Sequence, residues 1–258
     1  MVVDAAGTLP LPWLAPALAT ALATHRGHAL LVHGAPGVGA LPFALVLAQA
    51  WLCEDGAPQA PRPCGRCGSC RLVQSHLHPD LFVLLPTVRS RCQRLPLAAP
   101  APAAAASWLL SQGVTQPEVL LAASSGRPLD ALALARAGID AEAWSALPAA
   151  VAGGRAAALA GWPVPQAVDA LQKLCHDAMA RAGDGPARYF PTDRVPAGCS
   201  WPALASWSRE LVRIARHEDH PWQEGLMIDA LVALGRLALA TPVPGGAAPR
   251  RGFVTLDP

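Results

Sequence analysis

Four closely spaced cysteines constrain the fold of this chain more than any other sequence feature. Cys64, Cys67 and Cys70 form two overlapping Cys-x-x-Cys pairs, and Cys53 precedes them at the end of an apolar segment. Thiolates at this spacing, with glycine between them to allow tight turns, can surround one tetrahedral zinc ion. Four sulfur ligands leave no coordination position for water, so the expected Zn2+ is structural rather than catalytic. The alternative interpretation, a set of free thiols, is disfavoured by the dense spacing.

The other cysteines, together with the composition, indicate a cytoplasmic protein. Cys92, Cys175 and Cys199 are scattered, so the seven cysteines do not form a disulfide framework, and a reducing compartment fits better. With 52% hydrophobic and 15% charged residues, the 258-residue chain can bury a core in about two or three compact units. We expect no membrane partner, because no signal-like N-terminus or membrane-length apolar run is present.

The charge pattern gives little information about partners. The net charge of +2 is too small to indicate nucleic acid as the dominant partner, although a local basic patch is compatible with it. Of the 20 residues that are lysine or arginine, Lys173 is the only lysine. Together with the high alanine and proline content, this is typical of a GC-rich genome. The number of arginines is therefore weak evidence for any particular function.

A glycine-rich turn follows the apolar run Ala29–His33 and precedes an apolar helix expected at Phe43–Leu52. Gly34, Gly37 and Gly39 give this turn the context of a phosphate-binding loop. Its chemistry is missing, because Ala40 and Leu41 stand where the motif needs Lys and then Ser or Thr for the phosphates and Mg2+. Backbone amides of the loop can still attract an anion. We favour the interpretation that the loop is a remnant of the fold, in which the glycines serve the turn, and we expect no ATP hydrolysis.

Histidines and further elements follow the cysteine module. The pattern predicts a helix at Arg71–His78 and short strands at Leu81–Leu85 and Arg91–Leu97. His76 and His78 lie near the cysteines and are possible competing ligands. Because four sulfurs already complete the shell, we expect both histidines in loops or at the surface.

The remainder of the chain is predicted to be helical. Residues 96–102 have the composition of a linker, Ala149–Gly161 is a candidate boundary, and the segment after Thr241 is expected to be a disordered tail. The expected helices are Ala103–Leu110, Glu118–Ala123, Leu129–Ala137, Pro165–Arg181, Trp201–Arg216 and Trp222–Ala240.

Several of these motifs occur in the order of one known family. The degenerate phosphate loop, the four-cysteine module, the run His78–Leu81 and the segment Leu85–Gln93 (LPTVRSRCQ) resemble the delta-prime subunits of bacterial DNA polymerase III clamp loaders, which are AAA+ proteins. The resemblance implies an α/β plus all-α fold. Its parts would be a shortened AAA+-like parallel-sheet domain at 1–97 with the four-cysteine zinc module at 53–70, a helical lid at 98–148, a helical collar domain at 162–241 and a disordered tail at 242–258.

Arg91 is the candidate catalytic residue that the resemblance implies. In this family the Ser-Arg-Cys triplet lies at a subunit boundary, and its arginine reaches the ATP site of the neighbouring gamma/tau subunit. A planar, always charged guanidinium can stabilise the charge that develops during phosphoryl transfer. The alternative for Arg91 is a surface salt bridge. In the lid, the register of the family's sensor arginine falls on Leu129, so no ATP-sensing charge is expected there.

The chain departs from the family in the centre of its first domain. Leu81–Leu85 runs directly into Pro86, where the family has a Walker B-type strand and a sensor strand. No apolar strand ends in paired acids, so a magnesium site of that type is absent from the sequence. We expect the loss to leave unpaired strand edges and exposed apolar surface.

The resemblance implies a non-hydrolysing clamp-loader subunit that assembles with gamma/tau and delta. It would supply Arg91 in trans for ATP-dependent loading of the sliding clamp on primed DNA during replication. One alternative is a freestanding zinc-knuckle module that binds nucleic acid, against which the knuckle's lack of aromatic residues argues. Another is an ATPase in its own right, which Ala40 and the missing acidic pair oppose. A third is a non-functional truncated remnant.

Overall fold

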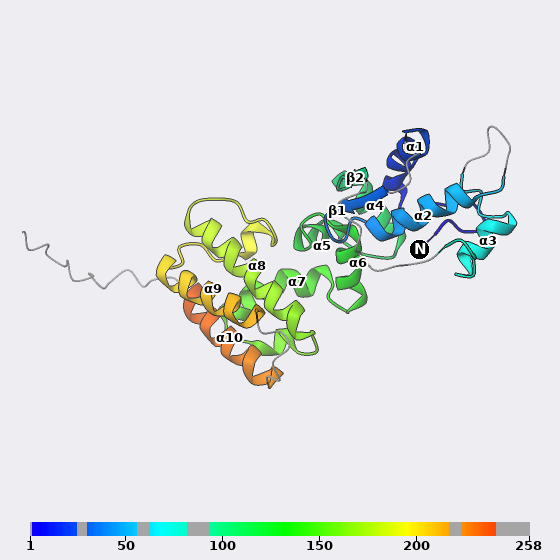
Figure 1. Cartoon of the computed structure of the whole chain (residues 1–258). Coiled ribbons are helices and arrows are strands. Elements are labelled where there is room, and N and C mark those ends of the chain that lie inside the picture. Colours follow the sequence, from blue (N-terminus) through cyan, green and yellow to red (C-terminus); the bar gives the residue numbers. More distant parts are fainter. Residues whose placement is uncertain (1, 25–29, 56–61, 82–92, 217–222, 241–258) are drawn as a thin grey trace, which may run out of the picture. The chain divides into compact units, whose positions relative to one another are not determined.

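The computed structural model of this chain describes residues 2–24, 30–55, 62–81, 93–216 and 223–240 (Figure 1). It is mostly helical, with one small parallel sheet and a cluster of four cysteines. The chain forms two compact units, residues 1–144 and 145–258, and the division falls inside helix α7 (Ala141–Ala152). Within the described part of the chain, no helix is long and apolar enough to cross a membrane.

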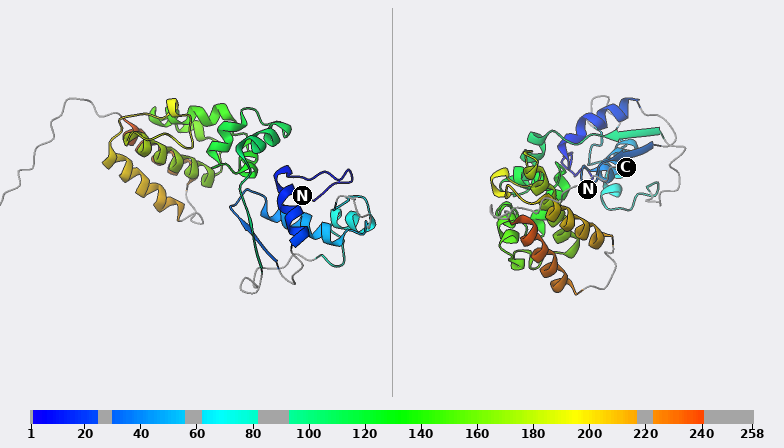
Figure 2. Two further views of the ribbon diagram at one scale, coloured as in Figure 1. Left: turned by 90° about the horizontal axis from the view of Figure 1, so that it is seen from above. Right: turned by 90° about the vertical axis from the view of Figure 1, so that its left-hand side faces the viewer.

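The sheet of the first unit contains strands β1 (Leu30–Gly34) and β2 (Gln93–Leu97), which lie side by side and run parallel (Figure 2). The register pairs Leu30 with Gln93 and Gly34 with Leu97. Parallel strands need a long crossover connection, and here the crossover carries helix α2 and the cysteine module. The predicted strands around β1 and β2 are thus confirmed, whereas residues 82–85 of the strand predicted at Leu81–Leu85 lie outside the described residues.

The described sheet is small and partly exposed. A strand at the centre of such a sheet is buried on both faces, but β1 is half-buried at Leu30 to Val32 and exposed at His33 and Gly34. Pro96 lies inside β2, and proline within a sheet is confined to edges because it lacks the N–H that a ladder needs. Within the described ranges the sheet has two strands, each with one unpaired edge.

Helices cover this sheet and extend from it. The unit begins with a short 3-10 helix, η1 (Pro12–Leu14), and α1 (Ala15–Thr24), and continues with α2 (Ala40–Leu52), α3 (Gly68–Gln74), α4 (Pro102–Ser111), α5 (Pro117–Ala123) and α6 (Pro128–Arg136). Helix α2 contacts α1, β1 and α3, and buries Phe43, Val46 and Leu47. Proline at the first turn of α4, α5 and α6 favours helix initiation, since the N–H it lacks has no partner there.

Two tryptophans attach the helices after β2 to the N-terminal segment. The Nε1–H of Trp108 in α4 donates a hydrogen bond to the carbonyl oxygen of Pro10 at 3.1 Å. The rings of Trp13 and Trp108 meet edge to face, with centroids 5.1 Å apart. The ring contact buries aromatic surface, and the hydrogen bond to Pro10 satisfies the polar atom of Trp108. The helices α4 to α6 consequently belong to the same compact unit as the sheet.

The second unit is built on three long helices. Its elements after α7 are η3 (Ala156–Leu159), α8 (Val164–Ala182), η4 (Thr192–Arg194), α9 (Trp201–Ala215) and α10 (Glu224–Leu239). Helices α8, α9 and α10 pack on one another around Leu171, Leu174 and Trp207, and the indole N–H of Trp207 donates to the carbonyl oxygen of Leu231 at 3.0 Å. The predicted helices are confirmed here, but α7 was not predicted from the sequence, and its last turn overlaps the candidate boundary at 149–161.

Candidate metal centre and degenerate phosphate loop

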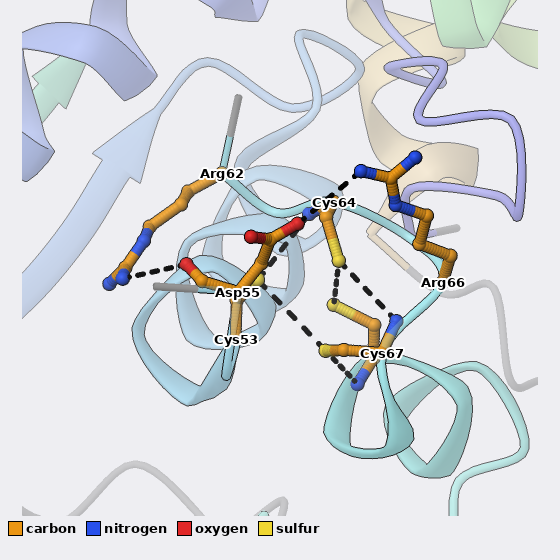
Figure 3. Close-up of polar contacts among 7 residues, drawn as sticks. Cys53, Asp55, Arg62, Cys64, Arg66 and Cys67 are labelled. Atoms are coloured by element: carbon orange, nitrogen blue, oxygen red, sulfur yellow. Dashed lines mark hydrogen bonds and ion pairs between the residues drawn. The ribbon is translucent and has the colours of Figure 1, made fainter. Parts of the chain in front are cut away.

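The four cysteines predicted to bind metal come together in the first unit. Cys53 directly follows α2, Cys64 and Cys67 lie in the connection, and Cys70 lies in the first turn of α3 (Figure 3). Their sulfur atoms all lie within 4.8 Å of one another. The Sγ–Sγ distance is 4.0 Å for Cys64–Cys70 and for Cys53–Cys67. A tetrahedral zinc with Zn–S bonds of about 2.3 Å requires sulfurs about 3.8 Å apart, so the cluster has the dimensions of such a site and can hold a metal ion.

Backbone N–H groups point at three of the sulfurs. The amide of Cys64 donates to Cys53 Sγ at 3.5 Å, that of Cys67 to Cys64 Sγ at 3.4 Å, and that of Cys70 to Cys67 Sγ at 3.4 Å. Burial acts to raise the pKa of Cys67, but the amides of Cys70 and Glu54 and the neighbouring thiols lower it to about 7. Burial raises the pKa of Cys70, and the adjacent sulfurs of Cys67 and Cys53 add to this effect. The cluster therefore favours a thiolate at Cys67, the form that binds metal.

The cysteine cluster is closed to solvent on most sides. Cys53, Cys64 and Cys70 are buried and Cys67 is half-buried. Four sulfur ligands complete a tetrahedral shell, so this donor set supplies structure and leaves no position for a reacting water.

The N-terminal segment holds the module in place. The side-chain amide of Gln74 in α3 donates to the carbonyl oxygens of Val3 at 2.9 Å and Gly65 at 2.7 Å. The buried Gln49 of α2 accepts from Val3 N at 2.9 Å and donates to Val3 O at 3.1 Å. The module is thus joined to α2 by hydrogen bonds between segments far apart in the sequence, and it is not a freestanding knuckle.

Charged side chains on the outside of the module contribute less. Arg66 forms an ion pair with Asp55 at 3.5 Å, and Arg62 donates to the carbonyl oxygen of Asp55 at 2.9 Å (Figure 3). The side chain of Arg66 is 72% exposed, and an ion pair so exposed is worth little because water screens it.

His78 is held by hydrogen bonds rather than by the cysteines. Its Nδ1 accepts from the backbone N–H of Asp80 at 3.1 Å, and its Nε2 lies 2.9 Å from Ser69 Oγ. A neutral imidazole that accepts at Nδ1 carries its proton on Nε2, so His78 donates to Ser69. Within the part of the chain that the structure describes, the group that could hold a metal ion consists of Cys53, Cys64, Cys67 and Cys70. The expectation that His76 and His78 are not ligands stays a prediction. The contact of Ser69 with His78 was not predicted.

The glycine-rich turn that the sequence suggests as a degenerate phosphate loop connects β1 to α2. Gly37 and Gly39 have positive φ angles of 75° and 101°, and α2 begins immediately afterwards at Ala40. The indole N–H of Trp13 donates to the carbonyl oxygen of Val38 at 3.0 Å, and a Cβ at Gly39 would collide with Leu11. The loop is therefore packed tightly against the segment that precedes α1.

Helix α6 covers the loop at Gly37. The backbone N–H of Leu129 donates to the carbonyl oxygen of Gly37 at 3.1 Å, and a Cβ at Gly37 would lie 2.6 Å from an oxygen of Asp130. Asp130 also accepts from Arg127 at 2.8 Å. The space beside Gly37 is thus occupied by the paired side chains of Arg127 and Asp130. The contact of α6 with the loop was not predicted from the sequence.

Comparison with known proteins finds relatives that are similar to part of the first unit. Residues 14–84 match the family model described as "DNA polymerase III, delta subunit". The chain is 35% identical over 79 residues to DNA polymerase III subunit delta' of Escherichia coli (strain K12), covering 29% of this chain and 23% of that protein. This part of the chain is delta-prime-like. The residues matched by the family model include the glycine-rich turn and the four clustered cysteines.

Further relatives match the same way over part of their length. Subunit delta' of Yersinia pestis is 42% identical over 64 residues, and that of Bacillus subtilis (strain 168) is 39% identical over 59 residues. These matches span 18% and 17% of the two relatives, so less than a quarter of each known protein has a matching segment here. The segment that carries Arg91 follows the region matched by the family model, and Arg91 itself lies outside the described residues.

Proposed function

We propose that this chain is a clamp-loader subunit of the delta-prime type that does not hydrolyse ATP and takes part in DNA replication. The observation that carries the proposal is the matched segment at residues 14–84, which contains both the degenerate loop and the four-cysteine cluster. In this role the chain assembles with gamma/tau and delta subunits. The assembly then loads the sliding clamp on primed DNA.

The loop supports a role without ATP turnover. Phosphoryl transfer needs a lysine on the phosphates and an oxygen ligand for Mg2+, and this chain has Ala40 and Leu41 at those positions. The ion pair of Arg127 and Asp130 occupies the space beside Gly37. A subunit built in this way uses the strand–loop–helix framework for packing and contributes to catalysis only through a neighbour.

Zinc is the metal that best fits the four-sulfur cluster in this proposal. It prefers tetrahedral thiolate ligands at the sulfur spacing found here and has no redox chemistry that would oxidise them. Cys53 at the end of α2 and Cys70 in the first turn of α3 would hold the ion together with Cys64 and Cys67, which would stabilise the long crossover between β1 and β2.

Arg91 is the residue that we propose acts in trans. Its guanidinium would reach the triphosphate bound by a neighbouring gamma/tau subunit and stabilise charge on the transferring phosphoryl group. This assignment rests on the resemblance of the surrounding segment to the family.

The test is reconstitution of the full chain with gamma/tau and delta, followed by ATPase measurement with clamp and primed DNA. We expect the three proteins to co-purify and Arg91→Ala to lower the ATPase rate by about tenfold or more, because arginine fingers contribute at least this much. Arg89→Ala, two residues away, is the matched control and should leave the rate unchanged. Failure to co-purify contradicts subunit membership, whereas co-purification with an unchanged Arg91→Ala rate contradicts only the finger.

A further inference from the structure

A buried carboxylate organises the connection between α8 and α9. Asp177 of α8 is fully buried, and its oxygens accept backbone hydrogen bonds from Arg188 at 2.9 Å, Tyr189 at 2.7 Å and Phe190 at 2.9 Å. Burying a charge is costly unless hydrogen bonds compensate for the lost water. Three consecutive amides do so here, and Phe190 is itself buried. The backbone of this segment is therefore held against α8. This fixes the backbone positions from which the side chains of Arg188 and Tyr189 extend.

Basic groups surround the ring of Tyr189. The guanidinium carbon of Arg188 lies 5.4 Å from the ring centroid and Lys173 Nζ lies 5.8 Å from it. The ring of His176 meets that of Tyr189 edge to face, with centroids 5.2 Å apart. We call these four residues the Tyr189 cluster. Arg188 is exposed, the His176 side chain is 54% exposed and Tyr189 is half-buried, so part of the cluster lies at the protein surface.

The composition of the chain makes this cluster unusual. Lys173 is the only lysine and Tyr189 the only tyrosine in 258 residues, and they lie in contact. Every other basic residue of the Lys/Arg type is arginine, so an ammonium group at this place is not explained by general amino-acid usage. Lys173 pairs with Asp169 while its side chain is only 11% exposed. A compact ammonium on a flexible stem suits that position better than a planar guanidinium does.

Some charged groups of the Tyr189 cluster are ion-paired or hydrogen-bonded, and others are not. Lys173 is paired with Asp169, and Asp177 is surrounded by amides and lies beside His176 at 3.1 Å. Among the residues that the structure describes, no ion pair involves Arg188. The cluster thus presents one available guanidinium beside an aromatic face, on a backbone that is already ordered.

We propose that the Tyr189 cluster binds single-stranded nucleic acid. A base stacks on the accessible part of the Tyr189 ring or on the guanidinium plane of Arg188, and Arg188 binds the adjoining phosphate. Aromatic rings and guanidinium planes are the surfaces on which unpaired bases stack without sequence preference, and cations beside them follow the backbone. With a net charge of only +2, the binding is weak and sensitive to salt. An acidic peptide would use the charge of Arg188 but not the ring.

This inference is independent of the proposed clamp-loader role, because the site lies in one unit of the chain and needs no partner. It is tested on the full chain with a fluorescein-labelled oligo-dT of about 20 nucleotides, by fluorescence anisotropy at about 50 mM salt. We expect saturable binding, and we expect Tyr189→Ala to weaken it about tenfold, the order of one stacked base. Tyr189→Phe keeps the ring and should retain the affinity.

Substitution of Arg188 separates the phosphate contact from stacking. Arg188→Gln should lower the slope of log affinity against log salt by about 0.7, the value for one phosphate contact on a single strand. The anchoring hydrogen bonds come from backbone amides, so these truncations leave them in place, and an unchanged thermal unfolding midpoint checks this. Arg194→Gln, in the same connection, and Arg66→Gln, on the cysteine module, are matched controls and should bind as the parent does.

Four outcomes overturn the inference. The first is absence of oligo-dT binding at low salt, and the second is unchanged affinity in both Tyr189→Ala and Arg188→Gln. The third is an equal loss of affinity in Arg66→Gln. The fourth is displacement of the oligonucleotide by a Glu-rich peptide whose own binding is weakened by Arg188→Gln but not by Tyr189→Ala. The third outcome would place the site on the cysteine module, and the fourth would make the ligand an acidic peptide.

Discussion

Gly65 lies between two of the clustered cysteines and has a backbone conformation that side chains disfavour. Its φ is 74°, and a Cβ there would collide with the carbonyl oxygen of Asp4. The glycine permits the N-terminal segment to approach the cysteine module closely, and Gln74 completes the contact by donating to the Gly65 carbonyl oxygen. The absence of a Cβ at Gly65 therefore allows the cysteine module to pack against the N-terminal segment.

We expect Gly65→Ala to lower the free energy of unfolding by about 2–4 kcal/mol, because it adds backbone strain and displaces the Asp4 carbonyl. Urea unfolding monitored by circular dichroism measures the change. Gly113→Ala is the matched control: its φ is 83°, but a Cβ there meets nothing within 4 Å, so only the strain of about 1 kcal/mol is expected. Equal losses in the two variants would argue against the close approach to Asp4.

Asp177 illustrates a different use of one residue. Its carboxylate is distant in sequence from the amides whose hydrogen bonds it accepts, and it orders a connection rich in proline and glycine that has little regular structure of its own. Charge-assisted hydrogen bonds of this kind are stronger than neutral ones. The position of Arg188 and Tyr189 follows from this single side chain.

Among the elements, α6 and the phosphate loop depend on each other. The start of α6 donates to the loop through Leu129, and Arg127 and Asp130 pack at Gly37. Arg127 and Asp130 are three residues apart, and their ion pair is partly exposed to water. The backbone hydrogen bond and the tight packing therefore stabilise the contact of α6 with the loop more than the charges do. The loop is thereby used as a packing surface.

We expect Gly37→Ala to loosen the start of α6. A Cβ there would lie 2.6 Å from Asp130 Oδ1 and 2.9 Å from Arg127 Cβ, and the φ of 75° adds strain. Amide hydrogen exchange should rise by about tenfold or more across residues 127–131, since local stability sets the protection. Gly138→Ala, with a φ of 80° and nothing within 4 Å, should leave that segment protected. Unchanged exchange in Gly37→Ala would show that α6 does not depend on the loop.

At the scale of the whole molecule, the metal cluster and the three-helix core belong to different compact units. All four cysteines lie in residues 1–144, whereas α8, α9 and α10 lie in residues 145–258. Binding of a metal to folded ligands contributes directly to folding free energy. Its loss should therefore affect the first unit selectively.

We expect a strong zinc chelator to raise amide exchange in residues 64–74 by about tenfold or more and to leave α8 and α10 unchanged. Cys67→Ser should have the same effect without chelator, because a serine hydroxyl is a poor zinc ligand. Exchange measured by mass spectrometry, with the zinc content of the purified protein, tests both. A zinc-free protein with fully protected residues 64–74 would remove the metal assignment.

Local sequence patterns were sufficient for much of this molecule. The Cys-x-x-Cys spacing predicted the four-sulfur cluster, and the apolar run before Gly34 predicted β1 and the loop. Helical spacing predicted α4, α5, α6, α8, α9 and α10. These predictions succeed because each depends on residues within a few positions of one another. Helix α7 was missed, since its alanine-rich end was interpreted as a boundary although alanine favours helix.

By itself, the sequence determined which four cysteines form the cluster, the absence of a lysine at Ala40 and the order of the predicted helices, since spacing and residue type decide these properties. Only the tertiary structure decided that Asp130 lies at Gly37, that Val3 ties the module to α2, and that the chain's single lysine and single tyrosine meet beside Arg188. These are contacts between residues far apart in the chain. Their geometry depends on how whole elements pack, which no local pattern specifies.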